Sequence, residues 1–155
     1  MIVLSTALVL SACAPSLPSK TAGLKRAKDA RNRLEFKDGR GRLVVDGTGK
    51  ALPSDFPADM PIYKPSQVKG TVASRGAGET TMTMTIFKAD AKVAEVAVFY
   101  QNSLPASGWT IDSTAGTEPG AVMLVAAKDN QTGSISIRRD KGIKATIISI
   151  NVVNK

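Results

Sequence analysis

The 155-residue chain has no histidine and only one cysteine. Without an imidazole it can build neither a Ser-His-Asp nor a Cys-His catalytic pair, and one cysteine cannot form an internal disulfide. Its apolar N-terminal run, Ile2 to Leu10, is too short to cross a bilayer as a helix, which needs about 20 residues. The composition therefore predicts no cofactor and no metal site, and it restricts any enzyme to chemistry based on Asp, Glu, Lys, Ser or Tyr.

The apolar run leads into Leu10-Ser11-Ala12-Cys13, which resembles the lipobox of bacterial lipoproteins at all four positions. The resemblance implies cleavage before Cys13 and acylation of its thiol, so residues 1–12 would be a signal peptide. No basic residue precedes the run, which leaves open a start upstream of Met1. A buried N-terminal strand with a chance cysteine and a redox cysteine are the alternatives. The Pro- and Ser-containing stretch after Cys13 and the lack of a CxxC partner disfavour both.

Two or three acyl chains hold a protein essentially permanently at a membrane. The expected location is therefore the cell envelope, with the chain anchored by lipid. In the lipoprotein family, Asp after the cysteine favours retention in the inner membrane, whereas this chain has Ala14. The resemblance thus implies the periplasmic face of the outer membrane if the source is Gram-negative.

Positive charge is concentrated between anchor and domain. Residues 20–50 hold ten bases and four acids, a net charge of +6, whereas residues 51–155 carry a net charge of +2. We interpret residues 13–50 as the lipidated cysteine, a linker and a basic arm, which is either a solvated tether or a contact with anionic lipid or cell-wall surfaces. Nucleic acid is disfavoured as a partner by the export signal. The candidate contact residues are Lys25, Arg26, Lys28, Arg31, Arg33, Arg40 and Arg42.

Local patterns within the arm predict little structure. Thr21 to Arg33 can form a short helix that is marginal alone, because it has little apolar face. Leu34 to Phe36 and Leu43 to Val45 flank an Asp-Gly turn, which favours a short hairpin.

Residues 51–65 contain four prolines and are predicted to form an extended strap against the domain. The strap segment LPSDFPADMPIY and the later segment FYQNSLPASGW together resemble a recurrent domain of small, largely uncharacterised bacterial envelope lipoproteins. The resemblance covers roughly Leu43 to Val152 and implies a fold and a location, but no activity. Asp55 and Asp59 lie four residues apart on the strap with no enforced separation, so they predict neither a metal site nor paired acid–base chemistry.

Residues 51–155 are predicted to be an α+β domain. Strands are expected at 68–74 and at 80–86, where apolar residues alternate with Thr, and a helix is expected over 90–104. Asp90 is the expected N-cap, and Pro105 and Gly108 are expected to end the helix. Four more strands are expected after the helix, and the first of them begins at Trp109. The Trp109 side chain is expected in the core. The order ββαββββ predicts an antiparallel sheet of about four to six strands covered by one helix.

Three functions fit these features. The favoured hypothesis is a non-catalytic envelope lipoprotein that binds a partner protein or serves as an accessory subunit. The alternative is a binding module for a small apolar or cell-wall ligand held between helix and sheet beside Trp109. An enzyme whose acidic, lysine or serine side chains come together from distant segments is the third.

Overall fold

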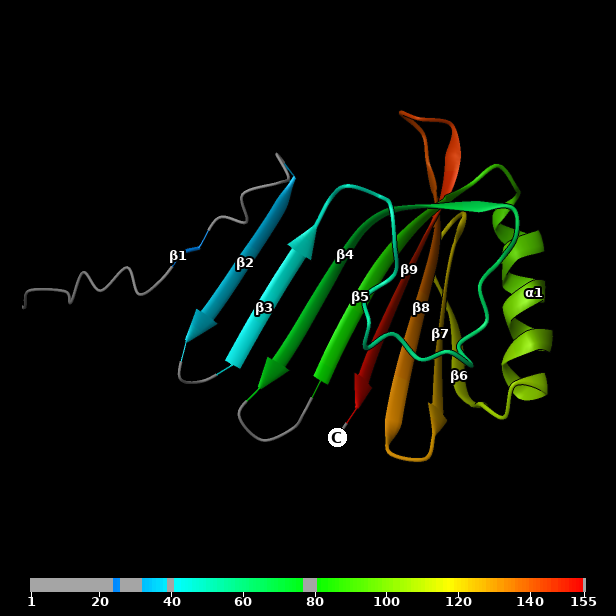
Figure 1. The fold of residues 1–155 in the computed structure, drawn as a ribbon. Coiled ribbons are helices and arrows are strands. Elements are labelled where there is room, and N and C mark those ends of the chain that lie inside the picture. Colours follow the sequence, from blue (N-terminus) through cyan, green and yellow to red (C-terminus); the bar gives the residue numbers. More distant parts are fainter. Residues whose placement is uncertain (1–23, 26–31, 39–40, 77–80, 155) are drawn as a thin grey trace, which may run out of the picture.

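The structure is a computed structural model that describes residues 24–25, 32–38, 41–76 and 81–154. The described strands form one antiparallel sheet in the order β1-β2-β3-β4-β5-β9-β8-β7-β6, and the described part of the chain contains one helix, α1 (Figure 1). The elements are β1 (Leu24–Lys25), β2 (Arg33–Asp38), β3 (Gly41–Asp46), β4 (Ser66–Gly76), β5 (Thr81–Ala89), α1 (Val93–Ala106), β6 (Thr110–Glu118), β7 (Ala121–Lys128), β8 (Gln131–Asp140) and β9 (Ala145–Asn154).

One face of the sheet carries the hydrophobic core. Along β5, burial alternates with period two as predicted, but the residues directed inward are Thr83, Thr85 and Phe87, whereas the apolar Met82 is exposed. The inward side chains of β8 and β9 are mostly isoleucines, and all of these are fully or almost fully buried. Each such large apolar side chain contributes roughly 1.5–3 kcal/mol to folding, so this face supplies most of the stability.

Helix α1 covers only one end of that face, where it packs on β6, β7 and β8 (Figure 1). Its buried side is formed by Val96, Ala97, Tyr100 and Leu104. Trp109 follows the helix directly and is 1% exposed, which confirms its predicted place in the core. The side chains of α1, Trp109 and the sheet together fill the space between helix and sheet.

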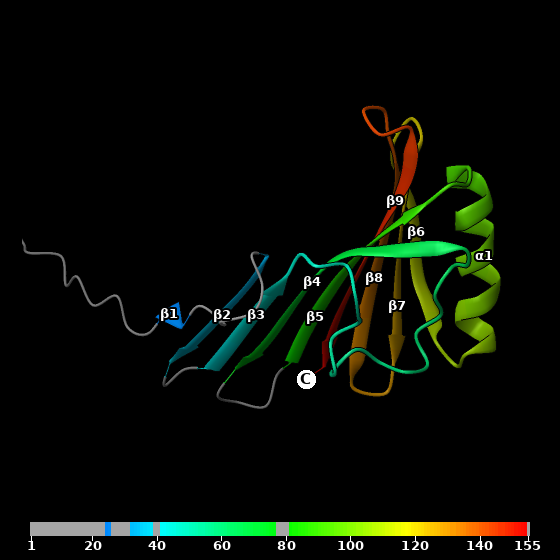
Figure 2. The same cartoon turned by 45° about the horizontal axis from the view of Figure 1, so that its top comes forward.

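The strap, residues 51–65, covers the next part of the same face. It runs from the end of β3 across the sheet toward α1 and then returns to the start of β4 (Figures 1 and 2). Phe56, Met60 and Tyr63 are buried in the core. The Tyr63 hydroxyl donates a hydrogen bond of 2.7 Å to Glu95 on α1, which ties the strap to the helix.

The predicted class and the element order are confirmed, but the predicted sheet size is wrong. Strands β4 to β9 with α1 follow the order ββαββββ, whereas the described strands form a sheet of nine instead of four to six. The difference arises because the hairpin of the arm does not stand apart. Its second strand, β3, pairs with Thr71–Gly76 of β4. One sheet therefore contains strands from both sides of residue 51, where the domain was predicted to begin.

The short helix predicted at residues 21–33 is also wrong where the structure describes it. Leu24 and Lys25 form β1, which pairs with Phe36 and Glu35 of β2, and Arg33 begins β2. The other residues of that stretch, 21–23 and 26–31, lie outside the described part of the chain. Pairing with a neighbouring strand outweighs the weak helical tendency of a segment with little apolar face.

Both ends of α1 differ from the predicted ends. The N-cap is Lys92 rather than Asp90, and it makes no side-chain capping bond. Side chains from β8 and β9 hold the preceding residue instead, because the Thr146 hydroxyl and Arg139 both donate to the Ala91 carbonyl. Pro105 lies within the last helical turn rather than ending the helix, which stops before Gly108 with its φ of +82°.

The outer strand β6 pairs irregularly. Its register with β7 shifts between Ile111 and Ser113 and again between Gly116 and Glu118. Residues 112–116 are exposed.

Candidate functional site

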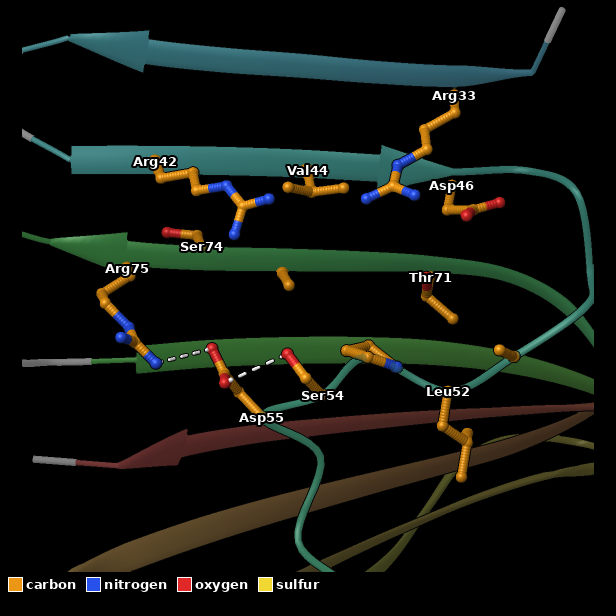
Figure 3. A pocket seen from close by; sticks show the side chains of 13 residues that line it. Arg33, Arg42, Val44, Asp46, Leu52, Ser54, Asp55, Thr71, Ser74 and Arg75 are labelled. Carbon is orange, nitrogen blue, oxygen red and sulfur yellow. Dashed lines mark hydrogen bonds and ion pairs between the residues drawn. The ribbon is translucent and has the colours of Figure 1, made fainter. Parts of the chain in front are cut away.

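A pocket of about 480 Å³ lies between the first residues of the strap and strands β3 and β4 (Figure 3). It sits beside the part of the sheet that α1 leaves uncovered. Its lining comes from three strands and the strap: Arg33, Arg42, Val44, Asp46, Ala51, Leu52, Pro53, Ser54, Asp55, Thr71, Ala73, Ser74 and Arg75.

The floor of this pocket continues the face that carries the core. Directly paired residues cross the sheet from Val44 through Ala73, Thr83 and Val152 to Gly133. Since paired residues lie on the same face, this row joins the pocket to the buried side of β9 and β8. Thr83 is the one polar side chain of this row, and its buried hydroxyl has no hydrogen-bond partner among the described residues.

Two guanidinium groups point toward one another across this floor. Arg42 reaches along the sheet from one side of Val44, and Arg33 of the neighbouring strand reaches from the other side (Figure 3). The Arg42 Nε donates to Glu35 Oε1 at 2.8 Å, which lowers the pKa of Glu35 and raises that of Arg42. The Arg33 Nε is buried and has no hydrogen-bond partner in the described part of the chain.

The acids of the pocket are held at its two ends. Asp55 on the strap accepts a hydrogen bond of 3.0 Å from Arg75 Nη2 on β4. Asp46 accepts the backbone N–H of Thr48 at 2.8 Å. The hydrogen bonds from Thr48, together with the charge of Arg33, hold the pKa of Asp46 below its ordinary value of 3.8. The Asp46 carboxylate therefore stays ionised at neutral pH. Both carboxylates are already engaged in hydrogen bonds.

A second ion pair fastens the strap farther along the sheet. Lys128 at the end of β7 pairs with Asp59 and also donates a hydrogen bond of 2.9 Å to the Ser107 carbonyl. The two strap carboxylates thus have different partners on different strands.

The arrangement can bind a ligand through its shape and charge, because it combines an aliphatic floor, guanidinium donors and engaged carboxylates. The Ser54 hydroxyl in the lining donates a hydrogen bond of 3.3 Å to Asp55, whose other carboxylate oxygen is bonded to Arg75. The described residues hold no group of three or more His, Cys, Asp or Glu side chains that could bind a metal ion. None of the described helices has the length and apolar character needed to cross a membrane.

The structure separates the residues predicted as sites. Arg33 and Arg42, assigned to an arm that contacts anionic surfaces, line the pocket. Lys25 lies in β1. The remaining predicted residues, the lipidation site Cys13 among them, lie outside the described part of the chain: Cys13, Arg26, Lys28, Arg31 and Arg40.

Sequence reasoning missed the other walls of the pocket, Asp55, Thr71, Ala73 and Arg75. The one available signal was the alternation Arg42-x-Val44-x-Asp46, which places three side chains on the same face of a strand. The ligand position proposed between helix and sheet beside Trp109 is instead packed with side chains.

The fold and pocket define an α+β protein with one open, partly polar end on its core face. A family model described as START domain-like matches residues 67–143, just under half of the chain. The matched stretch runs from β4 through the turn after β8 and includes Ala73 and Arg75, but neither Arg33, Arg42 nor the strap. Searches among curated proteins and among solved structures found no significant match.

Proposed function

We propose that this chain is a ligand-binding module and that the pocket beneath the strap is its binding site. The observation that carries the proposal is a hollow of about 480 Å³ at the open end of the core face, walled by a strap that the ion pairs of Asp55 and Asp59 fasten to the sheet. Small-molecule sites have volumes of roughly 300–1,000 Å³ and combine apolar surface with a few polar groups. The similarity to the START domain-like family supports a binding role.

We further propose that the module acts at a membrane of the cell envelope, anchored through acyl chains on Cys13. The lipobox and the preceding apolar run support the anchor. Ala14 after the cysteine supports the outer membrane if the source is Gram-negative. An anchored module would present its pocket close to lipids and to cell-wall material, and its partner in the envelope would be whatever delivers or takes the ligand.

Filling the pocket tests the binding role. Ala73 projects from β4 into the pocket floor, so Ala73→Leu removes much of the free volume while keeping the residue apolar. Ala115→Leu on the exposed part of β6 is the matched control. The full chain in non-ionic detergent is incubated with a small-molecule and lipid extract of its own envelope, and bound compounds are read by native mass spectrometry.

We expect a bound compound on the wild type and on Ala115→Leu, and a loss of roughly tenfold or more in occupancy on Ala73→Leu. Equal occupancy in the two variants would show that the ligand lies elsewhere. If neither the wild type nor either variant retains a compound, the proposed binding function is wrong.

A further inference from the structure

We infer that the ligand of this pocket is a small organic anion, whose phosphate or carboxylate group lies between Arg33 and Arg42 above Val44. This inference rests on the proposed binding function. It goes further by assigning the chemical class of the ligand and the residues that select it.

The orientation of the two arginines is the first reason. Two like charges that point toward one another repel, and exposed arginines can ordinarily turn apart into solvent. Here both guanidinium groups are aimed at the space over the same aliphatic side chain (Figure 3). An oxyanion in that space would turn the repulsion into two attractions. The planar fork of a guanidinium matches both carboxylate and phosphate geometry.

Unused donors are the second reason. Arg42 uses its Nε for Glu35, and no bond within the described residues occupies its terminal nitrogens. The Arg33 Nε is buried without a partner there. A buried donor left unpaired carries a desolvation cost, so an incoming acceptor at this position gains more than a hydrogen bond formed in open water.

The third reason is that the engaged carboxylates limit which ligands the pocket accepts. Asp46 is bonded to Thr48, and Asp55 is bonded to Arg75, so neither fills the space between Arg33 and Arg42. Their negative charges at the ends of the pocket disfavour a ligand with several anionic groups. The structure therefore favours one compact anionic group with a neutral body that rests on Leu52, Pro53 and Ala73.

The experiment follows the Arg33 side chain itself. The full chain, labelled with ¹⁵N-arginine in non-ionic detergent, is titrated separately with inorganic phosphate, glycerol phosphate and butanoate while the Nε–Hε signals are recorded. A further arm adds phosphatidylcholine vesicles with or without phosphatidylglycerol. Shifts with the soluble anions identify a free metabolite as the source, and shifts only with phosphatidylglycerol identify a lipid headgroup. Both results support the inference.

Arg33→Gln removes one guanidinium and should weaken anion binding by roughly tenfold or more, since a hydrogen bond to a charged group is lost. Arg138→Gln is the matched control, because Arg138 is an exposed arginine on β8 outside the pocket. Arg33→Lys keeps the charge but not the fork, and we expect it to bind with intermediate affinity. If Arg33→Gln does not fold, the titration of the Arg33 signal in the wild type still tests the inference.

The inference is overturned if no anion shifts the Arg33 signal saturably, or if Arg33→Gln and Arg138→Gln bind alike. If envelope compounds still depend on Ala73 while Arg33→Gln binds them normally, the inference fails and the binding function stands. If Ala73→Leu also has no effect, both fail.

Discussion

Gly133 on β8 offers a sharp test of the core packing. A Cβ added at this glycine would lie 2.9 Å from the Met60 Cε and 3.3 Å from the Trp109 Cζ3. The methionine end is flexible and can move, but Trp109 is 1% exposed and confined on all sides. The indole ring therefore occupies the space that a side chain at position 133 would need.

The magnitude follows from two opposing contributions. Overpacking a core costs about 1–3 kcal/mol. Replacing Gly by Ala restricts the unfolded chain and returns about 0.4–1 kcal/mol. Gly133→Ala should therefore destabilise the protein by about 1 kcal/mol, which lowers the urea midpoint by about 0.5 M. In a Trp109→Phe background the indole contact is gone, and the same substitution should be neutral or stabilising by about 0.5 kcal/mol.

Urea unfolding followed by far-UV circular dichroism measures the effect of Gly133→Ala in both backgrounds. Tryptophan fluorescence does not serve here, because Trp109→Phe removes the only tryptophan of the chain. Gly116→Ala on β6 is the control, since its nearest neighbour would be the Ala121 carbonyl oxygen at 3.9 Å. Independent sites add within about 0.3–0.5 kcal/mol. If Gly133→Ala costs the same in both backgrounds within that margin, Trp109 does not pack on Gly133 as described.

Two further predictions concern the anchor and the pocket. Cys13→Ser should abolish labelling by radioactive or alkyne-tagged fatty acid and leave the precursor uncleaved, and a variant that is still acylated and processed would refute the lipoprotein assignment. The lowered pKa of Asp46 stabilises the fold above pH 3.8, the ordinary pKa of the group, and this contribution is lost as the pH falls through the folded-state pKa. Asp46→Asn should therefore be less stable than the wild type at neutral pH, by a gap that shrinks toward pH 2 in urea unfolding curves. Asp112→Asn on the exposed part of β6 should show no such trend if the hydrogen bonds from Thr48 are the cause.

The sequence predicted those parts of the fold that depend on local periodicity. The Thr and apolar alternation of β5, the helical spacing of Val96 and Tyr100, and the position of Trp109 after a helix end are each readable within about a dozen residues. Element order then follows from the chain itself.

Pairings between distant segments were not readable in this way. The charge of the arm suggested a tether, whereas β3 pairs with β4, because the backbone groups at a strand edge pair without regard to the net charge of the segment. The pocket also depends on contacts between segments that are distant in the sequence. Asp55 meets Arg75 twenty residues later only because the strap crosses the sheet, and no spacing in the sequence encodes that meeting.

The floor of the pocket could not be recognised from the sequence for a related reason. A strand that alternates Arg42, Val44 and Asp46 has the pattern of a solvent-facing strand. These three side chains line a pocket only because the strap lies above the strand.

The irregular pairing of β6 bears on self-association. A strand at the edge of a sheet is a template on which a second copy can add its own strand, and a membrane anchor of the kind proposed would raise the local concentration of copies. The two register shifts against β7 bend the outer strand away from a regular ladder, and the exposed Asp112 places a charge on it. Among the residues that the structure describes, the opposite edge of the sheet is β1, which has two residues. The edge at β6 thus carries features that oppose edge-to-edge aggregation.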